Sequence, residues 1–311
     1  DLSYAEKKLQ VKKLDVTEAD WEYHLTGFLP LDLSFYAVDK RVLDMPQNFR
    51  LQVKGKRLEL IRWFIPDIEY LKGDFEGDWN ITGSLFHPQL DGKMNVKDGS
   101  LKFVQLVDPV EQLTVEMRMQ NENLILDRIS GFVEKSESEG VSSFWKFWKV
   151  FSKEKKLKGE INGFGTINLK DINNIDYDLY FSGDKVPANY EYADISGVVD
   201  FSVQITGKTL PLVSAQIALS QLYYREPFSS SSSGSGSESS LTPTYTGEDL
   251  WDWDFDISVP NNCWIINNDV NLELKGDVKV LREGGELKIL GDMETIRGKY
   301  FLYGKRGREH V

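Results

Sequence analysis

The amino-acid sequence predicts an all-β protein whose strands form one long, curled antiparallel sheet. Two observations carry this prediction: apolar and polar side chains alternate along most of the chain, and turn dipeptides separate some of the alternating segments. The 311 residues provide about twenty such segments by this pattern. Open twisted sheets of that many strands normally curl or fold over on themselves.

The alternation is clearest in residues 251–259. The apolar positions there are Trp251, Trp253, Phe255, Ile257 and Val259, and the polar positions between them are Asp252, Asp254, Asp256 and Ser258. Because successive side chains of a strand point to opposite faces, such a strand has one apolar face and one polar face. This pattern is typical of antiparallel sheets rather than of buried parallel strands.

The same alternation recurs through the chain. It is found at residues 21–25, 31–35, 49–53, 115–119, 177–181, 199–205, 272–274, 278–280 and 287–289. Asp98-Gly99 and Gly284-Gly285 separate neighbouring segments, and both dipeptides tolerate the positive φ angles of two-residue hairpin turns. We therefore expect a hairpin at each of these two dipeptides.

Three segments depart from the strand pattern. Residues 58–64 resemble a short helix that ends before Pro66. The insert at residues 141–156 places aromatic side chains at helical spacing beside lysines, which predicts a short amphipathic helix over 142–156, either packed over the sheet or lying at a membrane surface. Residues 229–240 are rich in serine and glycine, and we expect a flexible loop there.

Composition argues against several classes of function. A net charge of −12 disfavours nucleic-acid binding, and a single cysteine excludes an internal disulfide. The three histidines have no metal-ligand spacing, and no nucleophile or phosphate-binding motif occurs. Asp252, Asp254 and Asp256 are better explained as a solvated strand face than as glycosidase carboxylates. We therefore expect neither an enzyme nor a bound metal or cofactor.

The chain is expected to form one elongated region over residues 1–311. The N-terminal residues contain neither a signal peptide nor an initiating methionine, so the sequence is expected to be mature, trimmed or part of a larger protein. A weak internal repeat, Asn80-Ile81-Thr82-Gly83 and Gln204-Ile205-Thr206-Gly207, each followed by proline, is also typical of an elongated array.

Two stretches near the C-terminus resemble a known family. Residues 276–280 (GDVKV) and 291–304 (GDMETIRGKYFLYG) resemble the C-terminal domain of the TamB family, the inner-membrane-anchored component of the translocation and assembly module. Residues 27–31 and 66–73 fit the same family. Two features depart from its pattern: the 141–156 insert and the 229–240 loop look like additions. The sequence also stops at Val311, where members usually continue.

The resemblance implies a β-taco, a sheet folded lengthwise into an open apolar groove. It further implies a periplasmic location within a protein anchored in the inner membrane and reaching the outer membrane, where an Omp85-type barrel (TamA-like) is the partner. The implied function is a hydrophobic conduit that carries phospholipid between the two membranes and supports outer-membrane biogenesis. The alternative is a scaffold or chaperone that assembles outer-membrane proteins such as autotransporters by β-augmentation.

In the conduit hypothesis, phospholipid acyl chains contact the apolar strand faces, and membrane contact itself belongs to other parts of the full-length protein. The residues expected to line the groove are Val199, Phe201, Val203, Ile205, Trp251, Trp253, Phe255, Ile257, Val259, Leu272, Leu274, Val278, Val280, Leu287, Ile289 and Met293.

Overall fold

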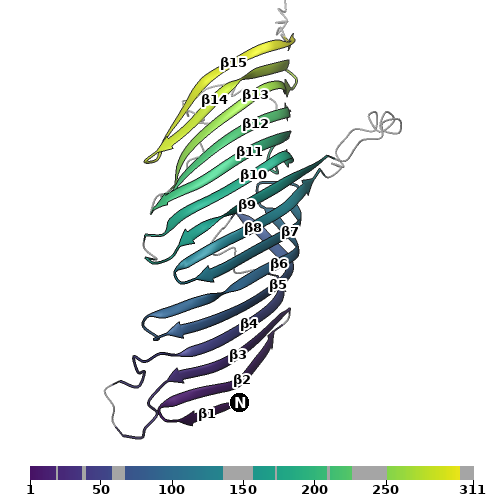
Figure 1. Ribbon diagram of the computed structural model, residues 1–311. Helices are drawn as coiled ribbons and strands as arrows, with labels where there is room; N and C mark the ends of the chain where they lie inside the picture. Colours follow the sequence, from purple (N-terminus) through teal and green to yellow (C-terminus); the bar gives the residue numbers. More distant parts are fainter. Residues whose placement is uncertain are drawn as a thin grey trace, which may run out of the picture.

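The computed structural model describes residues 1–18, 20–36, 40–57, 67–135, 157–171, 174–208, 211–225 and 251–301. These residues form a single fifteen-stranded sheet, which rises as one curved layer from β1 near the N-terminus to β15 (Figure 1). The strands are β1 (Leu2–Ala5), β2 (Lys8–Glu18), β3 (Trp21–Pro30), β4 (Asn48–Arg57), β5 (Ile68–Gly83), β6 (Pro88–Phe103), β7 (Val110–Gln120), β8 (Asn123–Glu134), β9 (Lys158–Asn168), β10 (Asp176–Asn189), β11 (Ile195–Lys208), β12 (Leu212–Tyr224), β13 (Asp252–Ile266), β14 (Val270–Glu283) and β15 (Glu286–Tyr300).

The order of strands in the sheet is the order in the sequence. Every neighbouring pair is antiparallel except β12 and β13, which are parallel. The predicted all-β curled sheet is thus confirmed, with one parallel step. At this step β13 starts beside the start of β12, where Asp252 pairs with Leu212, and 27 residues separate the two strands in the sequence.

No helix occurs among the described residues. The helices predicted at 58–64 and 142–156 and the loop predicted at 229–240 lie outside the described residues.

The strands are fewer and longer than the sequence pattern suggested. The predicted hairpin at Asp98-Gly99 is wrong, because β6 continues through both residues. Asp98 has a φ of 48°, and the pairing of β6 with β7 shifts register between Val96 and Gly99. The dipeptide therefore forms a β-bulge of the kind whose first residue has a positive φ, and here that residue is Asp98.

Similar bulges bend strand after strand. Residues with positive φ lie within register shifts on β7, β10, β12 and β13, at Gln112, Lys185, Gln221 and Asn262. A bulge bends its strand and increases the local twist. Repeated bends of this kind curl the sheet.

The alternation at residues 31–35 does not form a strand either. Leu31 makes only an isolated bridge with Val42, and Phe35 is fully exposed. The Asp32 carboxylate accepts a hydrogen bond from the backbone N–H of Ser34 at 2.9 Å. A local turn of this kind competes with the extended conformation.

The hairpin predicted at Gly284-Gly285 is confirmed. These two glycines connect β14 to β15, with φ angles of 55° and 88°. Their positive φ angles match the twist of the flanking strands, as a two-residue turn requires.

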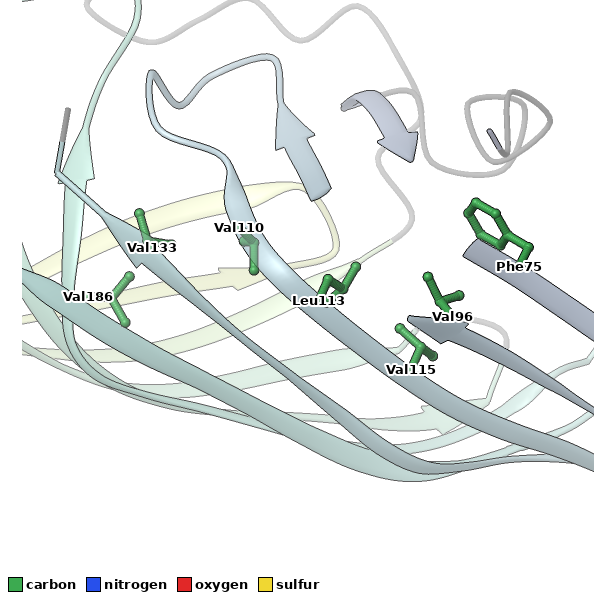
Figure 2. Close-up of a cluster of buried hydrophobic side chains, with 7 residues drawn as sticks. All are labelled: Phe75, Val96, Val110, Leu113, Val115, Val133 and Val186. Carbon is green, nitrogen blue, oxygen red and sulfur yellow. The ribbon is translucent and has the colours of Figure 1, made fainter. Parts of the chain in front are cut away.

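The core lies where the middle strands bend. Figure 2 shows its seven buried side chains, which come from β5, β6, β7, β8 and β10; they are Phe75, Val96, Val110, Leu113, Val115, Val133 and Val186. Val96 is only 2% exposed. Because the described residues form a single layer, side chains on one face can be buried only by others from that face. The sheet therefore curls toward its apolar face.

Candidate functional site

One face of the sheet carries unbroken rows of apolar side chains and glycines, and we call it the apolar face. Residues that pair directly across neighbouring strands share a face. One such row, the central row, connects β3 to β15 and consists of Trp21, Gly55, Phe75, Val96, Val115, Ile129, Gly163, Phe181, Val203, Ala215, Phe255, Val280 and Ile289. At about 4.8 Å per strand, twelve steps make it about 58 Å long.

A second row runs beside the central row. It connects β3 to β13 through Tyr23, Val53, Gly77, Met94, Met117, Leu126, Gly165, Leu179, Ile205, Val213 and Trp253. The two rows together form a continuous apolar strip across most of the sheet. Most of its large side chains are partly exposed rather than buried.

The residues predicted to line a groove lie on this face. On β11 they are Val199, Phe201, Val203 and Ile205; on β13, Trp253, Phe255, Ile257 and Val259; on β14, Leu272, Leu274, Val278 and Val280; and on β15, Leu287, Ile289 and Met293. Trp251 immediately precedes β13, and its ring centroid lies 6.3 Å from that of Tyr177 on β10. The rings of Trp253 and Phe255 stack at 5.7 Å.

The sequence prediction missed the N-terminal half of the face. Val53, Met94, Met117 and Leu126 continue the second row on β4, β6, β7 and β8. The alternation at 49–53 and 115–119 was a usable signal. The alternation does not show, however, which residues pair across neighbouring strands, and only that pairing places them in one row.

Glycines on the apolar face make room for aromatic rings on the next strand. A Cβ at Gly55 would lie 2.3 Å from the ring of Trp21, and one at Gly163 would lie 2.5 Å from the ring of Phe181. Gly183 and Phe201 show the same arrangement at 2.3 Å. The large rings therefore lie over glycine positions and do not project from the apolar face.

The opposite face is polar and ion-paired. Lys279 Nζ on β14 lies 2.6 Å from Asp254 Oδ1 and 3.1 Å from Asp256 Oδ1 on β13. Hydrogen bonds to Asp254 and then to Asp256 raise the pKa of the Lys279 ammonium. These carboxylates balance a cation on the outer surface, as a solvated strand face does. Within the described residues, no three His, Cys, Asp or Glu side chains come together as metal ligands.

The second half of the chain matches a family model described as the TamB C-terminal domain, over residues 150–306. The chain belongs to the TamB family. The match covers just over half of the chain and includes β9 to β15. A search of curated proteins gave no match, and a search of solved structures gave none either.

Family membership associates this TamB protein with outer-membrane assembly and with the cell envelope. Strands β1 to β8 lie outside the matched residues, yet they continue the same sheet and the same apolar rows. In the part of the chain that the structure describes, no helix is both long enough and apolar enough to cross a membrane.

Proposed function

We propose that the apolar face is a path for phospholipid acyl chains. In this proposal the protein carries phospholipid between the inner and outer membranes, from a periplasmic position, and so supports outer-membrane biogenesis. The supporting observation is the pair of apolar rows. The central row continues through thirteen strands, and where its residues Phe75, Val96 and Val115 are buried, Met94 and Met117 of the second row stay partly exposed. Contiguous exposed apolar surface of this extent is typical of a ligand or partner site.

The path requires no catalytic group. Acyl chains removed from water gain about 25 cal/mol per Å² of buried apolar area, which holds them against the sheet. A lining of similar apolar side chains at each step lets a chain slide without a large barrier. Head groups stay in water on the open side of the curl.

The variant Val203→Asp tests the proposal at the middle of the central row. Val203 is a better test position than Ile289. Val203 pairs with Phe181 on one side and Ala215 on the other, whereas Ile289 is on the last described strand and is 65% exposed. An ionised carboxylate in the acyl path should lower phospholipid transfer between donor and acceptor vesicles by about threefold or more. Because the site is partly exposed, the variant should remain folded by circular dichroism.

Gln204→Asp is the matched control. Gln204 is the next residue on β11, is exposed on the polar face, and pairs with Tyr180 and Ser214. Its transfer rate should equal that of the wild type. Normal transfer by a folded Val203→Asp protein would contradict the proposal.

A second candidate function is a scaffold for outer-membrane proteins. All residues of β15 are exposed, and among the described residues β15 pairs on one edge only. A free strand edge can add a strand from another chain. Mass spectrometry of lipids extracted from the purified protein separates the two candidates: stoichiometric phospholipid supports the conduit, and its absence supports the scaffold.

A further inference from the structure

At one end of the strands, β9 and β10 separate and no longer pair with each other. Pairing of β8 with β9 continues to Glu134 and Lys158, at the end of both strands. Pairing of β9 with β10 stops earlier, at Glu160 and Asp184. The last part of β10, from Lys185 onward, therefore leaves its neighbour while β10 still pairs with β11.

Beyond this point β10 crosses the apolar face of β9. Lys185, with a φ of 48°, marks the bend. A Cβ at Gly159 would lie 2.3 Å from the Cα of Val186, so the backbone of β10 lies directly on Gly159. Val186 and Val133 are both buried, and Figure 2 shows them beside Val110 of β7.

The tip of the β10–β11 hairpin then docks on the β6–β7 loop. We call this contact, between residues 105–108 and 189–191, the rim clasp. Val107 N–H donates to the Asn189 carbonyl at 2.9 Å, and Glu191 N–H donates to the Gln105 carbonyl at 2.9 Å. An isolated antiparallel bridge joins Leu106 and Tyr190 between them.

Side chains reinforce the rim clasp. The Asn189 amide donates to Asp108, which is buried. Lys102 Nζ, at the end of β6, lies 3.9 Å from Glu191 Oε2 and 3.5 Å from Glu69 Oε2, and it also donates to the Leu106 carbonyl. Backbone pairing, a buried polar contact and an ion pair thus hold the two loops together.

We propose that the rim clasp permanently closes one half of the lipid path at β8–β10. Lipid then passes this point only along the other half, which we call the narrow strip and which consists of Ile129, Gly163 and Phe181 of the central row and Leu126, Gly165 and Leu179 of the second row. This inference rests on the proposed conduit function and identifies the step that limits it.

The narrow strip has the properties of an open path. Pairing between β8, β9 and β10 is intact there, and Leu126 and Leu179 are partly exposed. Gly165 contributes no side chain, and the Leu179 side chain lies beside it, since a Cβ at Gly165 would be 2.9 Å from Leu179 Cδ2. On the clasp side of the same strands, Gly159 carries the β10 backbone and offers no free surface.

Equal substitutions along the second row test the narrowing. Val213 shares the row with Leu179 but lies on β12, where Val213 and Ala215 each pair with both β11 and β13. In the 311-residue protein, Leu179→Asp should lower phospholipid transfer about tenfold, and Val213→Asp about threefold, because lipid can pass beside a carboxylate only where the path is wide. Equal losses in both variants would overturn the narrowing and leave the conduit standing.

A labelling measurement decides the matter even if Leu179→Asp fails to fold. Single cysteines replace Leu179, Val133, Met94 or Val213 in a Cys263→Ala background, and the probe is a phosphatidylcholine with a maleimide at the end of one acyl chain, presented in vesicles. Cysteines at 179, 94 and 213 should react, and the cysteine at 133 should react at least about tenfold more slowly. Equal labelling at 133 and 179 would overturn the narrowing; no labelling at 94, 179 or 213 would overturn the conduit, and the narrowing with it.

A disulfide across the rim clasp tests its permanence. Leu106 and Tyr190 are bridge partners in an antiparallel arrangement, a geometry that brings Cα atoms within disulfide range. Leu106→Cys with Tyr190→Cys, again without Cys263, should transfer lipid at the same rate when oxidised and when reduced. Loss of transfer on oxidation, restored by reductant, would show that the clasp opens and would overturn permanent closure.

Discussion

Asp32 stabilises the segment after β3 through its negative charge. Its carboxylate accepts the Ser34 N–H at 2.9 Å and pairs with Lys7 Nζ at 2.9 Å. The hydrogen bond from Ser34, followed by that from Lys7, holds the pKa of Asp32 well below its usual range. Because Lys7 belongs to the β1–β2 turn, the contact ties the first hairpin to the chain beyond β3.

The lowered pKa predicts that Asp32→Asn lowers the stability of the protein by an amount that depends on pH. A carboxyl group whose pKa falls on folding stabilises the protein above its unfolded pKa of about 4, and that contribution disappears as the pH falls toward the folded pKa. The variant should therefore melt below the wild type at neutral pH, and the gap should close as the pH is lowered from about 4. Thermal melts at several pH values measure this.

Asp292→Asn is the control for Asp32→Asn. Asp292 is exposed on β15 and lies opposite Asp277, so the same loss of charge there should not lower the melting temperature at neutral pH. A constant gap for Asp32→Asn across the acid range would show that packing, rather than ionisation, explains its effect.

At the residue scale, alternation alone was enough to assign side chains to the apolar face. Trp253, Phe255 and Ile257 lie on that face because each is two residues from the next. Alternation could not show that Gly163 lies beneath the ring of Phe181, because that contact depends on which residues pair across the strands.

The β14–β15 hairpin isolates the effect of backbone conformation at the scale of an element. No atom lies within 4 Å of a Cβ built on Gly284, so a side chain there meets no obstacle. Its φ of 55° remains unfavourable for a β-branched residue. Gly284→Val should therefore lower the free energy of unfolding by about 1–2 kcal/mol, as measured by urea denaturation.

Gly284→Asn is the matched comparison, because asparagine tolerates this region and Asn-Gly is a favoured hairpin dipeptide. It should change the free energy of unfolding by less than about 0.5 kcal/mol. If both variants lower the free energy of unfolding by the same amount, the positive φ at position 284 is not the cause of the loss.

The elements also show where sequence reasoning was bound to be ambiguous. Both Asp98-Gly99 and Gly284-Gly285 tolerate positive φ angles, yet the first forms a bulge inside β6, with a positive φ at Asp98 alone, and the second a hairpin, with a positive φ at both glycines. A dipeptide that tolerates positive φ can therefore form either structure. The outcome depends on whether the following residues pair with the same strand or with the next one.

At the scale of the whole molecule, bound phospholipid should raise the melting temperature. Ligand that binds only the folded sheet stabilises it by mass action, by about 2.7 kcal/mol at a hundred times the dissociation constant. Unilamellar phospholipid vesicles should therefore raise Tm in a scanning fluorimetry experiment. Glycerophosphocholine, which has the head group but no acyl chains, should not; an equal rise with both would place the binding on the polar face.

The curl of the whole molecule followed from the number of strands, but the division between β9 and β10 could not be predicted. Asp108 and Asn189, which meet in the rim clasp, are 81 residues apart. No local pattern in either loop indicates the other. Only the crossing of β10 over Gly159 brings them together.

The strand order has a consequence for folding. Each pair of neighbouring strands is also consecutive in the sequence, so each strand except β13 can add to the growing sheet as the next antiparallel arm. Most of the connections are short, and closure of short loops is fast. β13 must instead pair in parallel with β12 across a connection of 27 residues, 225–251. We therefore expect β1–β12 and β13–β15 to form as two separate cooperative units, with their union at the parallel pair as the slow step.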